Sequence, residues 1–361
     1  MEKKERQSNI ELLRILAIAG VIILHYNNPA AGGGISYAAE GSLNFYILYL
    51  LESLFVCAVD LFMLISGYFM CGSKKRSLWK PIELIVQVIV FREAIYLGKA
   101  ALSFASFSVK SAVGALIPAN YFVILYCVVY MLSPYINVML DKLSEKSFRT
   151  LVIISVFLFS VYPTIVDVLG EIRGDQFIGL SSIGMYGSQW GYSIVNFLLM
   201  YLLGAYLKKG NAGILKWNSG KLAALLFSDV LLMVCWARVN DYVGFFTERS
   251  AWEYCSPLVI CAAVILFILF SRINLGANKA VNSLAEGVFT VFLLHNVFLS
   301  FLQIEKFVTG NALVMILHIL LSVALIYAVC WGVYLIYHKI TEPIFRALSD
   351  RIKLPVIDAE S

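Results

Sequence analysis

The first apolar stretch of the chain carries an arginine and a histidine at a spacing that places both on one face of a helix. Arg14 and His25 are 11 residues apart, which brings them within about 20° of each other around a helix axis. Glu11 lies one turn before Arg14, at a spacing that permits an ion pair. With Arg14 at the edge of a bilayer, His25 would lie about 16 Å deeper, near the middle of a hydrocarbon core about 30 Å thick. Glu11, Arg14 and His25 together predict a polar path along one helix face. The path ends on an imidazole, which exchanges protons near neutral pH.

Five further ionisable residues lie within apolar stretches: Asp60, Arg92, Glu93, Asp229 and His295. Each such side chain costs about 2.5–3.5 kcal/mol at a helix centre on insertion scales, so each needs a partner or a function. Arg92 lies about 18 Å along its helix from the basic loop at 74–80, and Asp60 lies about 10 residues before that loop. We therefore expect the helices that carry His25, Asp60 and Arg92 to surround one polar cavity.

Structural roles would also account for these residues. Arg14 could extend to the membrane interface, and Glu11 could do no more than neutralise it. Asp60 could be the structural partner of Arg92, and His25 could be a hydrogen-bonded packing residue. Helix contacts or interfacial positions would equally suit the other three histidines, His295, His318 and His338.

The composition indicates a membrane protein. Of 361 residues, 60% are hydrophobic and 14% are charged, and the mean hydropathy is +0.82. Soluble chains are usually about 45–50% apolar and about 25% charged, so a soluble domain and a disordered chain are both excluded. The apolar stretches are long and do not alternate, unlike those of a membrane barrel. The seven cysteines show no C-x-x-C spacing, so we expect neither a disulfide framework nor a metal site. The net charge of +5 is explained by basic loops, without nucleic acid as a partner.

The expected fold is all-α: a single polytopic domain over residues 1–361 with about ten transmembrane helices. The helix with His25 should end soon after that residue, because Asn27-Asn28-Pro29 and glycines follow. A tail at 339–361 is expected to be cytoplasmic. The spans are expected near residues 9–27, 43–70, 81–105, 119–140, 149–169, 190–207, 222–239, 253–271, 286–304 and 312–338.

The basic residues are distributed unequally between the two sides of these ten spans. The side of the N terminus, which begins with Lys3, Lys4 and Arg6, carries 20 of the 28 lysines and arginines. Because basic loops remain in the cytoplasm, we expect both termini to be cytoplasmic. The opposite loops carry five, namely Lys110, Arg173, Arg238, Arg249 and Lys306.

The segment SNIELLRILAIAGVIILHY, with Arg14 and His25 separated by ten residues, resembles the first helix of the acyltransferase family 3 integral-membrane enzymes. Arg92 lies where that family carries an arginine on its third helix. The resemblance covers almost the whole chain and is closest to the standalone surface-polysaccharide O-acetyltransferases. Further similar segments follow in order: VDLFMLISGYFM (59–70), ANYFVILYCVVYMLSPYI (119–136), YLLGAYLKK (201–209) and TVFLLHNVF (290–298).

The resemblance implies transfer of an acyl group, usually acetyl from acetyl-CoA, to a hydroxyl of a bacterial cell-surface glycan or its lipid-linked precursor. It implies a multi-pass protein of the plasma membrane, whose partners are acyl-CoA, the glycan acceptor and the lipid bilayer. His25 would be the catalytic base, with Asp60 fixing its tautomer. Arg14, with Glu11 beside it, and Arg92 would bind the acyl donor, and Arg92 could instead stabilise the oxyanion. No metal is implied.

Two other functions would use the same charged residues. A transporter or flippase for a glycan or a lipid-linked intermediate would use them as a substrate path, although the chain shows no internal repeat of the kind common in transporters. An inactive sensor or assembly subunit would keep only the scaffold. The presence of Arg14, His25 and Arg92 together argues against that second alternative.

Overall fold

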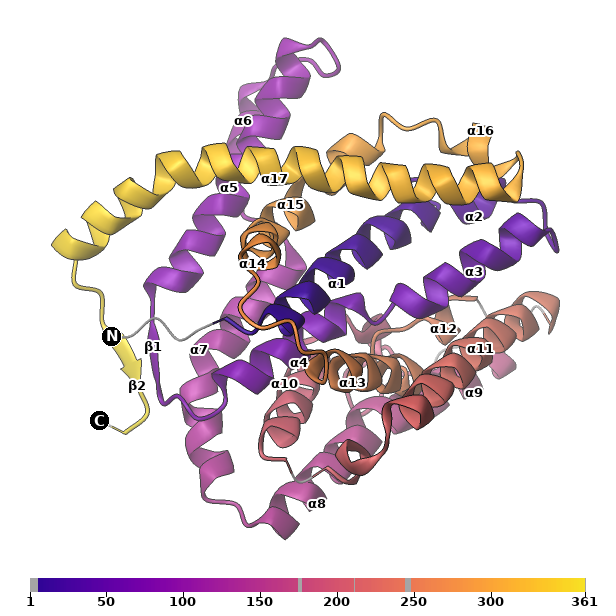
Figure 1. The fold of residues 1–361 in the computed structure, drawn as a ribbon, viewed down its shortest axis with the longest axis horizontal. Coiled ribbons are helices and arrows are strands. Elements are labelled where there is room, and N and C mark those ends of the chain that lie inside the picture. The colour runs from indigo at the N-terminus through magenta and orange to yellow at the C-terminus, as the bar shows by residue number, and fades with distance from the viewer. Residues whose placement is uncertain (1–5, 175–176, 211, 244–247, 361) are drawn as a thin grey trace.

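A computed structural model describes residues 6–174, 177–210, 212–243 and 248–360, which form an assembly of helices with one small sheet (Figure 1). Lys3 and Lys4, counted above, lie outside the described residues. A π-helical turn at Phe157–Val161 joins the helices Glu145–Val156 and Tyr162–Arg173. The helices are α1 (Ser8–Asn27), α2 (Gly34–Tyr37), α3 (Leu43–Phe55), α4 (Ala58–Met70), α5 (Trp79–Ala101), α6 (Val109–Ala115), α7 (Tyr121–Asp141), α8 (Glu145–Val156), α9 (Tyr162–Arg173), α10 (Ile194–Lys208), α11 (Ser219–Val243), α12 (Glu248–Ala251), α13 (Pro257–Ser271), α14 (Lys279–Glu286), α15 (Val288–Leu299), α16 (Ile304–Val308) and α17 (Ala312–Arg351).

Six helical segments among the described residues are long and apolar enough to cross a membrane. They are α1, α3 with α4, α7, α8 with α9, α11 and α17. A seventh span is possible if α14 and α15, which meet at a bend of 58°, are counted together, and α10 and α13 are shorter apolar helices. The helical, multi-pass class is therefore confirmed. The total of ten spans and the side of the termini stay predictions.

The expected span at 81–105 corresponds to α5, whose charged residues set it apart from the six apolar segments. Arg92 and Glu93 lie near its middle, and Glu83 and Lys99 lie toward its ends. Such a helix needs neighbours for its polar side chains, and α5 contacts α6, α7 and α15.

The C-terminal part of the chain differs in detail from the expected tail. The last span was expected to end at residue 338, but α17 continues without a break to Arg351. Two short strands, β1 (Lys75–Ser77) and β2 (Val356–Asp358), then pair antiparallel, with Arg76 opposite Ile357. The tail is thus attached to the basic loop that follows α4. This two-stranded sheet is the exception to the all-α expectation among the described residues.

The strands β1 and β2 lie on one side of the helix assembly, whereas α2 and α16 lie on the opposite side (Figure 1). We call these the terminal side and the far side. The helix α1 runs from the terminal side toward the far side through the centre of the assembly. It contacts α3, α4, α13, α14, α15 and α17.

The helix α1 ends where the sequence predicts. Its last residue is Asn27, and the chain then folds back, so that the Gly32 amide donates to the His25 carbonyl oxygen at 2.8 Å. Asn27 also ties α1 to α3: its Nδ2 donates to the Leu48 carbonyl at 3.2 Å and to Glu52 Oε2 at 2.9 Å. These bonds fix the end of α1, where His25 lies.

Side chains of α17 stabilise the bend between α14 and α15. Because the helix breaks at Gly287, carbonyl oxygens of α14 lack partners within the helix. The Tyr327 hydroxyl donates to the Leu284 carbonyl at 2.9 Å, and the Trp331 indole donates to the Ser283 carbonyl at 3.1 Å. The bend directs α15, which carries His295, along α1.

Candidate functional site

His25 of α1 and His295 of α15 form a pair of contacting imidazoles. Their ring centroids are 4.7 Å apart, and the ring planes meet at 75°, in an edge-to-face arrangement. His295 is 2% exposed, whereas His25 remains partly exposed. The sequence indicated each residue separately, but only the packing of α15 against α1 shows that they touch.

The hydrogen bonds of the two rings determine which nitrogen carries the proton. His25 Nδ1 lies 2.9 Å from the Val21 carbonyl oxygen. His295 Nδ1 lies 3.1 and 2.8 Å from the carbonyl oxygens of Val291 and Phe292. Because a carbonyl oxygen can only accept, Nδ1 donates in both rings, and Nε2 of the neutral imidazole keeps its lone pair. His25 is therefore oriented by its own helix to accept a proton at Nε2.

Arg14 lines a cleft of about 210 Å³ that begins on the terminal side. Its Nη1 lies 3.2 Å from Glu11 Oε1, which confirms the geometry expected for an ion pair. Lys80 is a second cation in the lining, which also contains the acid Glu286, and Phe292 forms part of the inner wall. The Phe292 ring lies 6.4 Å from the ring of His295. The cleft thus combines cationic side chains with an apolar interior close to the histidine pair.

A second cavity, of about 460 Å³, lies on the far side of the same histidine pair. Its lining includes Gly32, Ser300 and Gln303. Gly32 bonds to the His25 backbone, and Leu299, another lining residue, lies one turn beyond His295 on α15. This volume falls within the range of about 300–1,000 Å³ that is usual for small-molecule sites. Neither cavity has a histidine among its described lining residues, but each has a lining residue beside the pair: Phe292 of the Arg14 cleft lies near His295, and Gly32 of the second cavity bonds to the His25 backbone.

Asp60 does not take the position expected for it beside an imidazole. It is 1% exposed on α4, and its Oδ1 accepts from Asn196 Nδ2 of α10 at 2.9 Å. Asp60 Oδ2 has no hydrogen-bond partner among the described residues. The contact that fixes the tautomer of His25 comes instead from the Val21 carbonyl. Any helix offers a backbone carbonyl one turn before a histidine, so the tautomer of His25 can be fixed without a carboxylate.

Arg92 binds backbone atoms between α6 and α7. Its Nε donates to the Ala115 carbonyl at 3.3 Å and its Nη1 to the Ala119 carbonyl at 3.4 Å. Over the described ranges, no hydrogen bond or ion pair joins Arg92 to Arg14 or to His25. The structure thus brings Glu11 and Arg14 together and pairs His25 with His295, but it gives Arg92 separate partners.

One half-buried acid within an apolar stretch was not among the residues singled out from the sequence. Glu52 of α3 accepts from Asn27, two residues beyond His25. A charged residue in the middle of the expected span 43–70 was the signal that could have identified it. The described residues contain no cluster of three or more His, Cys, Asp or Glu side chains placed to hold a metal ion.

One of the comparisons with known proteins identifies the family of the chain. A family model for an acyltransferase domain matches residues 7–335. No curated protein and no solved structure is significantly similar to the chain. The matched region begins just before α1 and ends within α17, so it contains both histidines and both cavities. It covers almost the entire chain, and the chain therefore belongs to the acyltransferase 3 family.

Proposed function

We propose that this acyltransferase moves an acetyl group from cytoplasmic acetyl-CoA to a hydroxyl of a cell-surface glycan or its lipid-linked precursor. The protein would lie in the bacterial plasma membrane with both termini in the cytoplasm. One observation carries the proposal: a lining residue of the Arg14 cleft, Phe292, and a lining residue of the far-side cavity, Gly32, both adjoin the His25–His295 pair. A donor and an acceptor entering from opposite sides would meet at His25.

The Arg14 cleft suits the acyl donor. CoA carries several phosphate charges, and Arg14 and Lys80 supply charge-assisted hydrogen bonds at the entrance. Glu11 orients the guanidinium of Arg14. The thin pantetheine arm would then follow the apolar wall to Phe292, which brings the thioester toward the histidines.

The reaction at His25 follows from the free lone pair on Nε2. His25 Nε2 accepts the proton of the acceptor hydroxyl as that oxygen attacks the thioester carbonyl carbon. The tetrahedral intermediate then collapses, the carbon–sulfur bond breaks, and the proton on Nε2 passes to the CoA thiolate. The products are the ester of the glycan and free CoA. Val21 and His295 keep the imidazole in position during the proton transfer.

A transfer assay tests the proposal directly. Purified protein in proteoliposomes receives radiolabelled acetyl-CoA on one side and surface glycan extracted from cells that lack the gene. Label should appear as an alkali-labile ester on the glycan, and mass spectrometry should show the same ester only on glycans of cells that carry the gene. Movement of unmodified glycan across the vesicle without any acyl donor, and no ester, would replace this proposal with a transporter.

Replacing Arg14 with glutamine should weaken donor binding. We expect the KM for acetyl-CoA to rise about 10–100-fold with a smaller change in kcat, because one charge-assisted bond to phosphate contributes about 1.5–3 kcal/mol. The control is Arg346→Gln, which removes an exposed cation on α17. Arg92→Gln in the same assay tests the predicted donor role of Arg92. An unchanged KM for Arg14→Gln would show that the acyl donor does not bind in this cleft.

His295 should act as a positioning residue for His25. We expect His295→Ala to lower kcat about 10–100-fold with the donor KM nearly unchanged, because the His25 ring loses its edge-to-face neighbour. His295→Phe should restore much of the rate, since a phenyl ring occupies the same place. Full loss of activity in both variants would instead mean that a nitrogen of His295 takes part in the proton transfer.

A further inference from the structure

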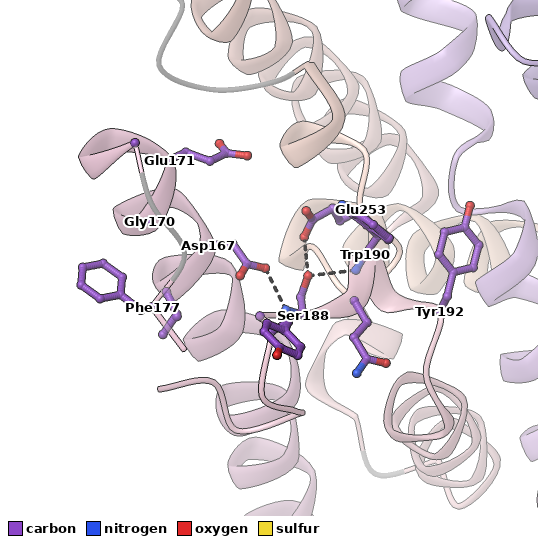
Figure 2. Close-up of a pocket in the computed structure, with 13 residues that line it drawn as sticks. Asp167, Gly170, Glu171, Phe177, Ser188, Trp190, Tyr192 and Glu253 are labelled. Carbon is purple, nitrogen blue, oxygen red and sulfur yellow. Dashed lines mark hydrogen bonds between the residues drawn. The ribbon is translucent and has the colours of Figure 1, made fainter. Parts of the chain in front are cut away.

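A third cavity, of about 820 Å³, lies on the far side at the end of α9. It is enclosed by α9, by the chain between Phe177 and Tyr192, and by the segment that follows α12 (Figure 2). None of its lining residues lines the two cavities beside His25. It is therefore a separate site, on the side from which we propose that the acceptor approaches.

Three carboxylates face this cavity, and no described lining residue carries a positive charge. Asp167 and Glu171 extend from α9, and Glu253 approaches from the opposite wall (Figure 2). Arg173, which ends α9, lies outside the lining, with its guanidinium carbon 5.2 Å from the ring centroid of Phe177. Carboxylates that share a cavity repel one another, so a cationic ligand would be stabilised there.

Ser188 holds two of these acids in place. Its backbone amide donates to Asp167 Oδ2 at 3.1 Å, and its hydroxyl donates to Glu253 Oε2 at 2.9 Å. Glu253 is 6% exposed. Burial, together with the charges of Asp167 and Glu171, raises its pKa to about 8. Asp167 and Glu253 are thus fixed before any ligand arrives, and a ligand cation would favour the ionised form of Glu253.

Aromatic rings form the rest of the wall. Trp190 and Tyr186, which line the cavity with Phe177 and Tyr192, are 50% and 58% exposed. Exposed aromatic faces attract cations and pack against the apolar faces of flat ligands. The three acids do not form a metal-ion cluster among the described residues. Carboxylates and aromatic rings together therefore favour an organic cation over a metal ion.

We propose that this cavity binds a saccharide that carries a free amino group, with the ammonium at Asp167, Glu171 and Glu253 and the sugar rings against Trp190 and Tyr186. The inference rests on the proposed function, because it takes the acceptor to be a glycan. It adds that the acceptor contains an amino sugar with an unacylated nitrogen. The volume of the cavity can accommodate more than one sugar ring.

Direct binding tests this without any acyl donor. Wild-type protein in nanodiscs is titrated with the tetramer of glucosamine and with the matched tetramer of N-acetylglucosamine, at a pH at which the amines are protonated. We expect the amino form to bind at least about tenfold more tightly, since its ammonium makes charge-assisted bonds. Glu171→Gln and Trp190→Ala should each reduce this preference, whereas Glu145→Gln, at the start of α8 and outside the cavity lining, should not.

The other outcomes each overturn a part of the proposal. Equal binding of both tetramers would show that the acids do not select an ammonium group. Spermidine binding as tightly as the amino tetramer would show that the saccharide contributes nothing, and displacement of the tetramer by Ca²⁺ would indicate a metal site. His25→Ala should bind the tetramer normally, so failure of the transfer reaction and failure of this cavity are distinguishable.

Discussion

Replacing His25 with alanine is expected to reduce acyl transfer by at least about 10²–10⁴-fold, the usual contribution of a positioned general base. No other described side chain is in place to substitute for it. His295 lies beside it with its centroid 4.7 Å away, but is 2% exposed. Asp60 bonds to Asn196 instead. The loss should appear in kcat, because donor contacts at the Arg14 cleft remain.

The measurement compares turnover with folding in the same preparation. His25→Ala removes the bond to the Val21 carbonyl and the ring contact with His295, so the melting temperature in detergent is measured beside that of the wild type to separate loss of fold from loss of catalysis. His338→Ala is the matched control, because His338 is an exposed histidine on α17 whose ion-pair contact is Glu342 at 3.3 Å. Undiminished transfer by folded His25→Ala would refute the catalytic role.

The sequence was most informative where a single helix determines the geometry. The spacing of Glu11, Arg14 and His25 depends only on helix periodicity, and the structure confirms the Glu11–Arg14 contact. The end of α1 near His25 follows from Asn28 and Pro29, and it is also confirmed. Such features need no knowledge of neighbouring helices, because rise and rotation per residue are constant.

Contacts between helices were predicted less well. The proposed cavity around His25, Asp60 and Arg92 assumed that equal depth brings side chains together. The depth of a residue in the membrane does not determine how its helix is rotated about its own axis. The packing of the helices against one another determines that rotation. Asp60 faces Asn196, and Arg92 faces the chain before α7. The partner of His25 proved to be His295, more than 250 residues later in the chain.

The segments that resemble the family explain part of this packing. Gly67 lies in the second segment (59–70) and Gly204 in the fourth (201–209). They belong to α4 and α10, which are in extensive contact. Gly67 approaches the backbone of Tyr201, and Gly204 approaches the backbone of Leu64. Small residues allow membrane helices to approach this closely. Two motifs distant in sequence are therefore the two halves of one crossing.

Replacing Gly204 with alanine should destabilise the protein, against the ordinary preference of helices. In an exposed helix, glycine to alanine stabilises by about 1 kcal/mol. At Gly204 the added methyl would lie 2.7 Å from the Tyr68 amide nitrogen and 3.0 Å from the Leu64 carbonyl carbon. Backbone atoms cannot rotate away as a flexible side chain can, so α4 and α10 must separate. Overpacking of this kind costs about 1–3 kcal/mol or more.

The control is a second helical glycine, at which alanine is expected not to lower the stability of the protein. A methyl on Gly332 of α17 would meet no atom within 4 Å, so Gly332→Ala should be neutral or slightly stabilising. Thermal melting monitored by size-exclusion chromatography in detergent distinguishes the two variants. Separation of α4 from α10 would also move Asp60 from Asn196, because these residues join the same two helices. If Gly204→Ala melts at or above the wild-type temperature, the two helices are not in backbone contact, and the close crossing of α4 and α10 is wrong.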